Sequence, residues 1–255
     1  MRLLDATTIR LQEFAEDKIP PYAILSHTWG NDEVSFQDMD RAKPTQKEGY
    51  VKIKYACKQA LIDELEYVWI DTCCIDKRSS SELSEAINSM FQWYRNARVC
   101  YAYLVDVPSN TIPLSPNSPF RKSRWFTRGW TLQELIAPPH VQFYFTDWTS
   151  LASKDELSSL ITEITSVDKF SLGGGDLRQA SIAKRMSWAS KRVTTRKEDI
   201  AYCLLGIFDA NMPMLYGKGD KAFVRLQEEI IKDSLPTKDE YFRNIERRDS
   251  SKENV

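Results

Sequence analysis

The sequence predicts an α/β protein with a mostly parallel sheet flanked by helices. Four short runs are apolar and rich in β-branched and aromatic residues, and helical patterns separate them; the runs are 22–26, 67–71, 99–104 and 141–145. Strands that are apolar almost throughout are typical of a sheet covered on both faces. Because alternating strands and helices form right-handed parallel crossovers, we expect four or more mostly parallel strands.

Two helices are predicted between the first three strands. Apolar residues recur at helical spacing over 46–65 and over 81–96. Ser79 lies three residues before Glu82, which is the spacing of a capping box at the start of the second helix. The proline-punctuated stretch 108–119 is expected to be a loop.

Beyond Trp148 the pattern predicts helices and no further strand. The helical segments are 154–165, 179–190, 198–208 and 221–232, with the glycines at 173–175 as a flexible break. We therefore expect one domain over 1–233, with an α/β core over about 20–148 and a helical part over about 149–233. Residues 234–255 are polar and highly charged, as in a tail or linker.

Composition and charge exclude several classes of protein. The 35 basic and 36 acidic residues give a formal net charge of −1, whereas non-specific nucleic-acid binding needs excess positive charge. No apolar stretch approaches the roughly 18 residues that span a bilayer, and Met1–Ala15 lacks the apolar core of a signal peptide. The five cysteines are odd in number and lie in apolar segments, which predicts reduced thiols in a cytoplasmic protein.

Polar residues follow the predicted strands, where ligands collect in an open parallel sheet. The residues concerned are Ser26, His27, Thr28 and Trp29 after the first strand, Asp71, Thr72 and Cys73 after the second, and Asp106 after the third. Their side chains should gather at one rim and form a binding site. Structural alternatives stay open: Asp71 as the cap of a turn, and His27 as a structural residue.

The segment 128–134 contains the main catalytic candidate. Trp130 and Glu134 are four residues apart, so a helix would place both on one face. An aromatic ring beside a carboxylate suits a nucleoside, and the guanidinium of Arg128 matches phosphate oxygens. The alternative is that Glu134 is a buried partner of Arg124 or Arg128 and that Trp130, like Trp125, belongs to the core.

Other sites are poorly supported. A zinc site is poorly supported, because the sequence contains two histidines, His27 and His140, and no spaced cysteine pair. No motif supports a catalytic dyad of His27 with Cys73 or Cys74 for acyl transfer. Residues 217–220 lack the full spacing of a phosphate loop, so we expect a turn that leads into the last helix.

Four blocks of the sequence resemble the heterokaryon-incompatibility (HET) family. They are 22–30 (YAILSHTWG), 69–76 (WIDTCCID), 124–135 (RWFTRGWTLQEL) and 196–208 (RKEDIAYCLLGIF), with 212–217 (MPMLYG) after the last. The resemblance covers about residues 20–230 in one order, which is more specific than any single short motif.

This resemblance implies an effector of regulated cell death in fungal self/non-self recognition, often followed in a longer chain by a nucleotide-binding oligomerisation module. HET domains are distantly similar to TIR domains, which implies a flavodoxin-like, TIR-related fold and self-association. Some TIR domains cleave NAD, and residues 130–134 are similar to their Trp-Cys-x-x-Glu segment, with Thr131 in place of the Cys.

By this resemblance Glu134 would be the catalytic carboxylate of an NAD glycohydrolase that needs no cofactor. The substrate would be bound by Ser26, His27, Trp29, Asp71, Arg128 and Trp130. Because fold kinship does not establish chemistry, a second function stays open: a non-catalytic adaptor that assembles with itself and recruits partners. An enzyme needs Glu134 in an open cleft, whereas an adaptor permits it to be walled off.

Overall fold

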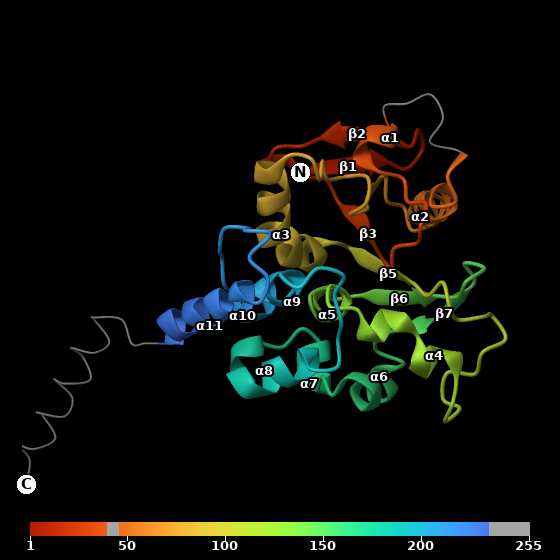
Figure 1. Cartoon of the computed structure of the whole chain (residues 1–255). Coiled ribbons are helices and arrows are strands. Elements are labelled where there is room, and N and C mark those ends of the chain that lie inside the picture. Colours follow the sequence, from red (N-terminus) through yellow and green to blue (C-terminus); the bar gives the residue numbers. More distant parts are fainter. Residues whose placement is uncertain (40–45, 235–255) are drawn as a thin grey trace, which may run out of the picture.

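A seven-stranded sheet runs through the computed structural model, which describes residues 1–39 and 46–234 (Figure 1). The strands are β1 (Arg2–Asp5), β2 (Arg10–Glu13), β3 (Tyr22–His27), β4 (Tyr67–Trp69), β5 (Val99–Tyr103), β6 (Val141–Tyr144) and β7 (Ser150–Ser153). Their order in the sheet is β2-β1-β4-β3-β5-β6-β7. The tail or linker expected over 234–255 lies outside the described residues from 235 onward.

The four strands predicted from the sequence form the parallel centre of the sheet. β3 pairs in parallel with β4 and β5, and β5 pairs in parallel with β6. All six residues of β3 are buried, because helices cover both faces of this strand. Numbered along the chain, the central order is 2-1-3-4, which is the flavodoxin-like arrangement.

Both edges of the sheet are antiparallel. β1 pairs with β4 and with β2 at one edge, and β7 pairs with β6 at the other. The prediction of no strand after Trp148 is therefore wrong for β7, and β1 and β2 also lie outside the range 20–148. These three strands have four residues each, and β2 and β7 are largely exposed or half-buried. Short edge strands lack the apolar run that identifies a central strand.

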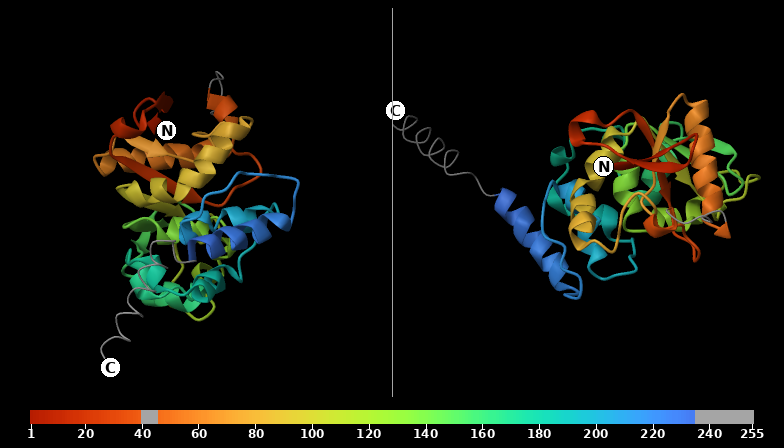
Figure 2. Two further views of the ribbon diagram at one scale, coloured as in Figure 1. Left: turned by 90° about the vertical axis from the view of Figure 1, so that its left-hand side faces the viewer. Right: turned by 90° about the horizontal axis from the view of Figure 1, so that it is seen from above.

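Helices cover both faces of the sheet (Figures 1 and 2). They are α1 (Phe36–Met39), α2 (Tyr50–Ile62), α3 (Ser80–Asn96), α4 (Pro119–Lys122), α5 (Thr131–Ile136), α6 (Ser158–Thr165), α7 (Lys169–Leu172), α8 (Ile182–Ala189), α9 (Asp199–Tyr202), α10 (Leu205–Phe208) and α11 (Lys221–Ser234), with short 3-10 turns η1 (Glu16–Lys18), η3 (Arg124–Thr127) and η4 (Leu177–Gln179). α2 packs on β3 and β4, whereas α5 packs on β3 and on α3. Figure 1 shows α2 and α3 on opposite sides of the strands.

The expected helices are confirmed: α2, α6 and α8 are shorter than predicted, whereas α3 and α11 extend one and two residues beyond the predicted bounds. Ser79 caps α3 by accepting a hydrogen bond from the backbone N–H of Glu82. The predicted helix over 198–208 is divided into α9 and α10. α10 packs against α3 at Gly206, where a Cβ would lie 2.0 Å from the Cβ of Phe91, so only glycine allows this approach.

Two further features follow from the described residues. Within 1–39 and 46–234, no helix combines the length and apolar character needed to cross a membrane. All five cysteines are free thiols and are buried.

Candidate functional site

A cavity of about 280 Å³ lies beside the carboxyl ends of β3 and β4. Its walls come from four separate parts of the chain, within 27–29, 71–90, 128–134 and 195–216. In the flavodoxin-like order β3 connects to β4 on one side and its neighbour β5 connects to β6 on the other, and open α/β sheets bind ligands at the carboxyl ends of the strands beside such a switch point.

Glu134 of α5 reaches this cavity although its side chain is almost wholly enclosed. The residue is 7% exposed, and its Oε2 accepts a hydrogen bond of 2.5 Å from the hydroxyl of Ser26. Burial raises the pKa of Glu134 to about 8; the charge of Asp71 adds to this effect, and the bond from Ser26 opposes it. The carboxyl bonds to Ser26 rather than to Arg124 or Arg128.

Asp71, which follows β4, is the second carboxylate in the cavity. Its two oxygens bond to Nε2 of His27 at 3.0 Å and to Nε1 of Trp29 at 2.8 Å. Burial alone would raise the pKa of Asp71, but the charge of Lys77 and these two bonds outweigh it and hold the pKa at about 2. At neutral pH Asp71 is therefore ionised, whereas Glu134 holds its proton.

His27 orients Asp71 from behind the cavity. Nδ1 of His27 lies 2.7 Å from Nζ of Lys52, and Lys52 lies 2.5 Å from Oε1 of Glu33. An ammonium group can only donate, so Nδ1 of His27 must accept and its Nε2–H must donate to Asp71. Both ring nitrogens are engaged in this way, so His27 activates neither Cys73 nor any other nucleophile.

Two tryptophan side chains enter the cavity, and a third tryptophan stays in the core. Trp130, at the N-terminal end of α5, lines the cavity on the same side of the helix as Glu134. Trp29 is 46% exposed, and Nζ of Lys77 lies 3.6 Å from its ring centre. Trp125 is fully buried, so the core interpretation holds for Trp125 and the ligand interpretation fits Trp130.

The segment after α8 closes one side of the site. The backbone of Val193 pairs with that of Arg128, and Nη1 of Arg128 donates to Oγ1 of Thr195 at 3.0 Å. Gly129 permits this contact, because a Cβ there would lie 2.4 Å from Cγ2 of Thr194.

The cavity is also lined by charged and aromatic side chains that the sequence did not indicate as site residues, among them Lys77, Arg196, Asp199 and Tyr216. The hydroxyl of Tyr216 donates to Asp199 at 3.0 Å, and the guanidinium of Arg196 lies over the ring of Tyr216. Burial raises the pKa of Asp199. The only sequence signal was that 196–208 and 212–217 belong to the family blocks, which gave no role for these side chains.

The structure brings most of the predicted site residues together. Glu134, His27, Trp29, Asp71, Arg128 and Trp130 all line the cavity. Ser26 is fully buried behind Glu134 and is not part of the cavity wall. Asp106 lies elsewhere, where it accepts hydrogen bonds from the hydroxyl of Ser123 and the backbone N–H of Arg124.

The glycines before α11 do not form a phosphate loop. The backbone N–H groups of Gly217 and Gly219 both donate to Oε1 of Glu198, each at 2.8 Å. The donors that a phosphate would need are therefore occupied, and the predicted turn before α11 is confirmed.

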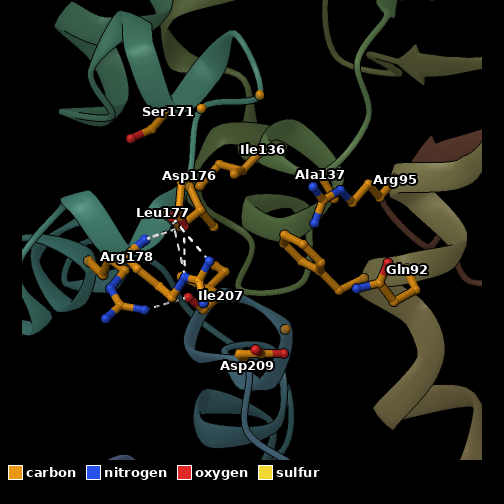
Figure 3. Close-up of a pocket in the computed structure, with 15 residues that line it drawn as sticks. Gln92, Arg95, Ile136, Ala137, Ser171, Asp176, Leu177, Arg178, Ile207 and Asp209 are labelled. Carbon is orange, nitrogen blue, oxygen red and sulfur yellow. Dashed lines mark hydrogen bonds and ion pairs between the residues drawn. The ribbon is translucent and has the colours of Figure 1, made fainter. Parts of the chain in front are cut away.

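Several arginines line a second cavity of about 370 Å³ (Figure 3), and their contacts indicate a structural role. Arg178 pairs with Asp176, as the dashed lines show. Arg185 donates to the carbonyl of Ile207 at 3.0 Å. Arg95 lies in the last turn of α3. Because cations stabilise the carbonyl ends of helices, these side chains serve α3 and α10, and the first cavity is the better candidate site.

Two comparisons with known proteins agree with the sequence pattern. Residues 22–119 match the family model described as heterokaryon incompatibility protein (HET). The chain is 47% identical over 244 residues to the vegetative incompatibility protein HET-E-1 of Podospora anserina, an alignment that covers 91% of this chain and 18% of the relative. The chain thus spans less than a fifth of that relative's length, and no solved structure matches it.

Proposed function

Since the chain contains a heterokaryon-incompatibility domain, we propose that it is an effector of fungal incompatibility that promotes regulated cell death and is activated by self-association. We propose further that its cavity cleaves NAD between nicotinamide and ribose, in the manner of TIR-like enzymes. In a longer chain, the domain would be joined to a nucleotide-binding oligomerisation module. The five free, buried thiols suit a reducing compartment, here the cytoplasm.

The observation that carries the catalytic proposal is a pair of carboxyl groups with opposite proton affinities in one cavity. The pKa of Glu134 is about 8 and that of Asp71 is about 2. Environments that separate two pKa values in this way are typical of acid–base sites. A purely structural carboxyl has no need to reach a cavity that also contains Trp130 and Arg128.

The reaction needs a carboxylate rather than a strong acid. The bond between C1′ of ribose and N1 of the pyridinium breaks, and its electron pair stays on nitrogen, so that nicotinamide leaves as a neutral molecule. Ionised Glu134 stabilises the oxocarbenium character that develops at C1′. Water then adds to C1′ and gives up one proton, which Glu134 accepts; the products are nicotinamide and ADP-ribose.

The bound substrate would itself put Glu134 in the required state. The nicotinamide ring of NAD carries a positive charge, which would favour the ionised carboxylate and oppose the effect of burial. Trp130 would stack on the substrate, and Arg128 and Arg196 would attract the pyrophosphate.

NAD consumption by the purified domain, with and without forced clustering, tests this proposal. Wild type is compared with Glu134→Gln, and Glu163→Gln is the matched control, because Glu163 is exposed on α6 and bonds only to Arg121 in the described residues. We expect turnover in wild type and Glu163→Gln and its loss in folded Glu134→Gln. Equal turnover in all three, or none even when clustered, would refute the catalytic proposal.

The adaptor is the second candidate, and an apolar groove favours it. A groove of about 660 Å³ runs between α8 and α11, with Ile182 and Ile231 exposed by 39% and 59%. A second copy of the chain is the occupant that the adaptor function requires. Light scattering of wild type and of Ile231→Lys tests this function: concentration-dependent dimers in wild type alone would support it, and a monomer at all concentrations would refute it.

A further inference from the structure

A buried chain of hydrogen bonds ends on the carboxyl group of Glu134. Nε1 of Trp125 donates to Oγ of Ser26 at 2.8 Å, and Oγ of Ser26 donates to Oε2 of Glu134 at 2.5 Å. Trp125 is 1% exposed and Ser26 is 0% exposed, so water does not compete for these bonds. These two hydrogen bonds join β3 to η3 and α5, which are distant from β3 in sequence.

Donor and acceptor rules fix the first of these bonds, and the surroundings of Ser26 fix the second. An indole N–H can only donate, so the oxygen of Ser26 must accept from Trp125. The hydroxyl of Ser26 has a single proton, and among the described residues Oε2 of Glu134 is the acceptor that this proton reaches. Oε2 is thus held as an acceptor, which favours Oε1 as the site of the proton of the neutral acid.

From this geometry we propose that Trp125 and Ser26 form a positioning relay that keeps the exchangeable proton of Glu134 on Oε1, the oxygen left for the cavity. Glu134 then presents an O–H to the cavity when neutral and an anionic oxygen when ionised. The relay stabilises the ionised form, because a hydrogen bond to the charged state favours that state.

Other charged or titratable groups surround Glu134, and Ser26 is the group that donates to its Oε2. The charge of Asp71 opposes ionisation of Glu134, and the charges of Arg128 and Arg192 favour it. Burial raises the pKa of Cys100 well above the ordinary value, so this thiol is neutral while Glu134 titrates. Nη1 of Arg192 is committed to the carbonyl of Arg128 and to Oγ1 of Thr131.

Tyr94 of α3 is the remaining neighbour of Glu134. Its hydroxyl donates to the carbonyl of Leu25 at 3.1 Å. Burial, and after it the charge of Glu134 and a side-chain contact with its carboxyl group, raise the pKa of Tyr94 well above the ordinary value. Tyr94 is therefore neutral, and its proton lies on the bond to the carbonyl of Leu25. Ser26 is the group whose removal should change Glu134 most.

The inference rests on the proposed function for its catalytic meaning. NAD cleavage needs the anionic oxygen of Glu134 on the cavity side, and the relay supplies that orientation. A proton on Oε2 would instead turn the acidic O–H toward the wall of the site. Ser26 and Trp125 are thus positioning residues, which act through Glu134.

The test is a titration of the substrate-free protein by NMR, with ¹³C in the glutamate carboxyl groups. The resonance of Glu134 is identified by its absence in Glu134→Gln. We expect Ser26→Ala to move the titration midpoint of Glu134 to higher pH by about 1–2 pH units, because the ionised carboxylate then loses a hydrogen bond that favours its charged form.

Ser171→Ala is the matched control. Ser171 is also buried, and its hydroxyl donates to the carboxylate of Asp168 at 3.1 Å, away from this cavity. It should leave the midpoint of Glu134 unchanged. An unchanged or lower midpoint in folded Ser26→Ala would overturn the proposal.

A second readout uses wild type alone and decides the matter if Ser26→Ala does not fold. The indole N–H resonance of Trp125 should shift with pH at the same midpoint as the carboxyl of Glu134. The indole N–H of Trp188, which has no hydrogen-bond partner among the described residues, should not shift. A Trp125 resonance that stays fixed while Glu134 titrates would overturn the relay. Both readouts omit substrate, so a failure of NAD turnover alone contradicts only the proposed function.

Discussion

Replacing Glu134 by glutamine should change how the stability of this protein depends on pH. The pKa of Glu134 is about 8 in the folded chain against a reference of 4.5. Between these values the folded state binds one more proton than the unfolded state, so the free energy of unfolding falls as pH rises. Each pH unit in this window corresponds to about 1.4 kcal/mol.

Between pH 5 and pH 8 this single group should therefore lower the stability of wild type by about 3 kcal/mol, as an order of magnitude. Glutamine has nearly the same shape, does not titrate, and its amide oxygen can accept the bond from Ser26. Glu134→Gln should match wild type near pH 5 and exceed it increasingly toward pH 8. The effect has this sign because burial penalises the charged form of Glu134.

Urea unfolding of both proteins at pH 5, 6, 7 and 8 measures this difference. Other titrating groups are common to both chains and cancel in the comparison. Glu163→Gln, on the exposed face of α6, serves as the control and should run parallel to wild type. If Glu134→Gln also runs parallel to wild type, Glu134 is not a buried carboxyl with a raised pKa, and the site argument fails with it.

Three further predictions concern the same site. Gly129→Ala should destabilise the fold by about 1–3 kcal/mol, because the new Cβ would lie 2.4 Å from Cγ2 of Thr194. Gly30→Ala is the control and should not destabilise the fold, because its Cβ would have its nearest neighbour at 3.6 Å. Urea unfolding of both variants checks this, and equal stabilities would contradict it. Carba-NAD, a cationic analogue that resists hydrolysis, should release up to about 0.9 of a proton on binding at pH 7, as calculated for a pKa of about 8. Calorimetry in buffers of different ionisation enthalpy measures this release; its persistence in Glu134→Gln would show that another group loses the proton. Asp71 contributes to the free energy of unfolding of wild type above about pH 4, and this contribution is lost as the pH falls toward 2, because folding lowers the pKa of Asp71. Asp71→Asn should remove this contribution, and acid unfolding curves of the two proteins that coincide would refute the prediction.

The parallel centre of the sheet was predictable because its signal is local. β3, β4, β5 and β6 are apolar runs, and burial on both faces leaves that mark on each strand separately. The edge strands β1, β2 and β7 carry no such mark, since four residues with one open side can be almost any sequence. Their pairing depends on neighbours that a local pattern does not contain.

The strand ends also placed much of the site in advance. The carboxyl ends of parallel strands meet at one rim, so residues that follow β3 and β4, such as His27 and Asp71, were predictable neighbours. Helical spacing likewise put Trp130 and Glu134 on one side of α5.

What the sequence alone determined, then, is the sheet centre and the rim, because each follows from periodicity within a short segment. The candidate carboxyl group followed from its chemistry beside an aromatic residue and from the family resemblance. Only the tertiary structure decided the state of that carboxyl. Its enclosure, the bond from Ser26 and the approach of 193–199 across Gly129 join segments about 60 to 110 residues apart. Proton affinity depends on all charges and dipoles within a few ångströms, and chain order does not specify which groups those are.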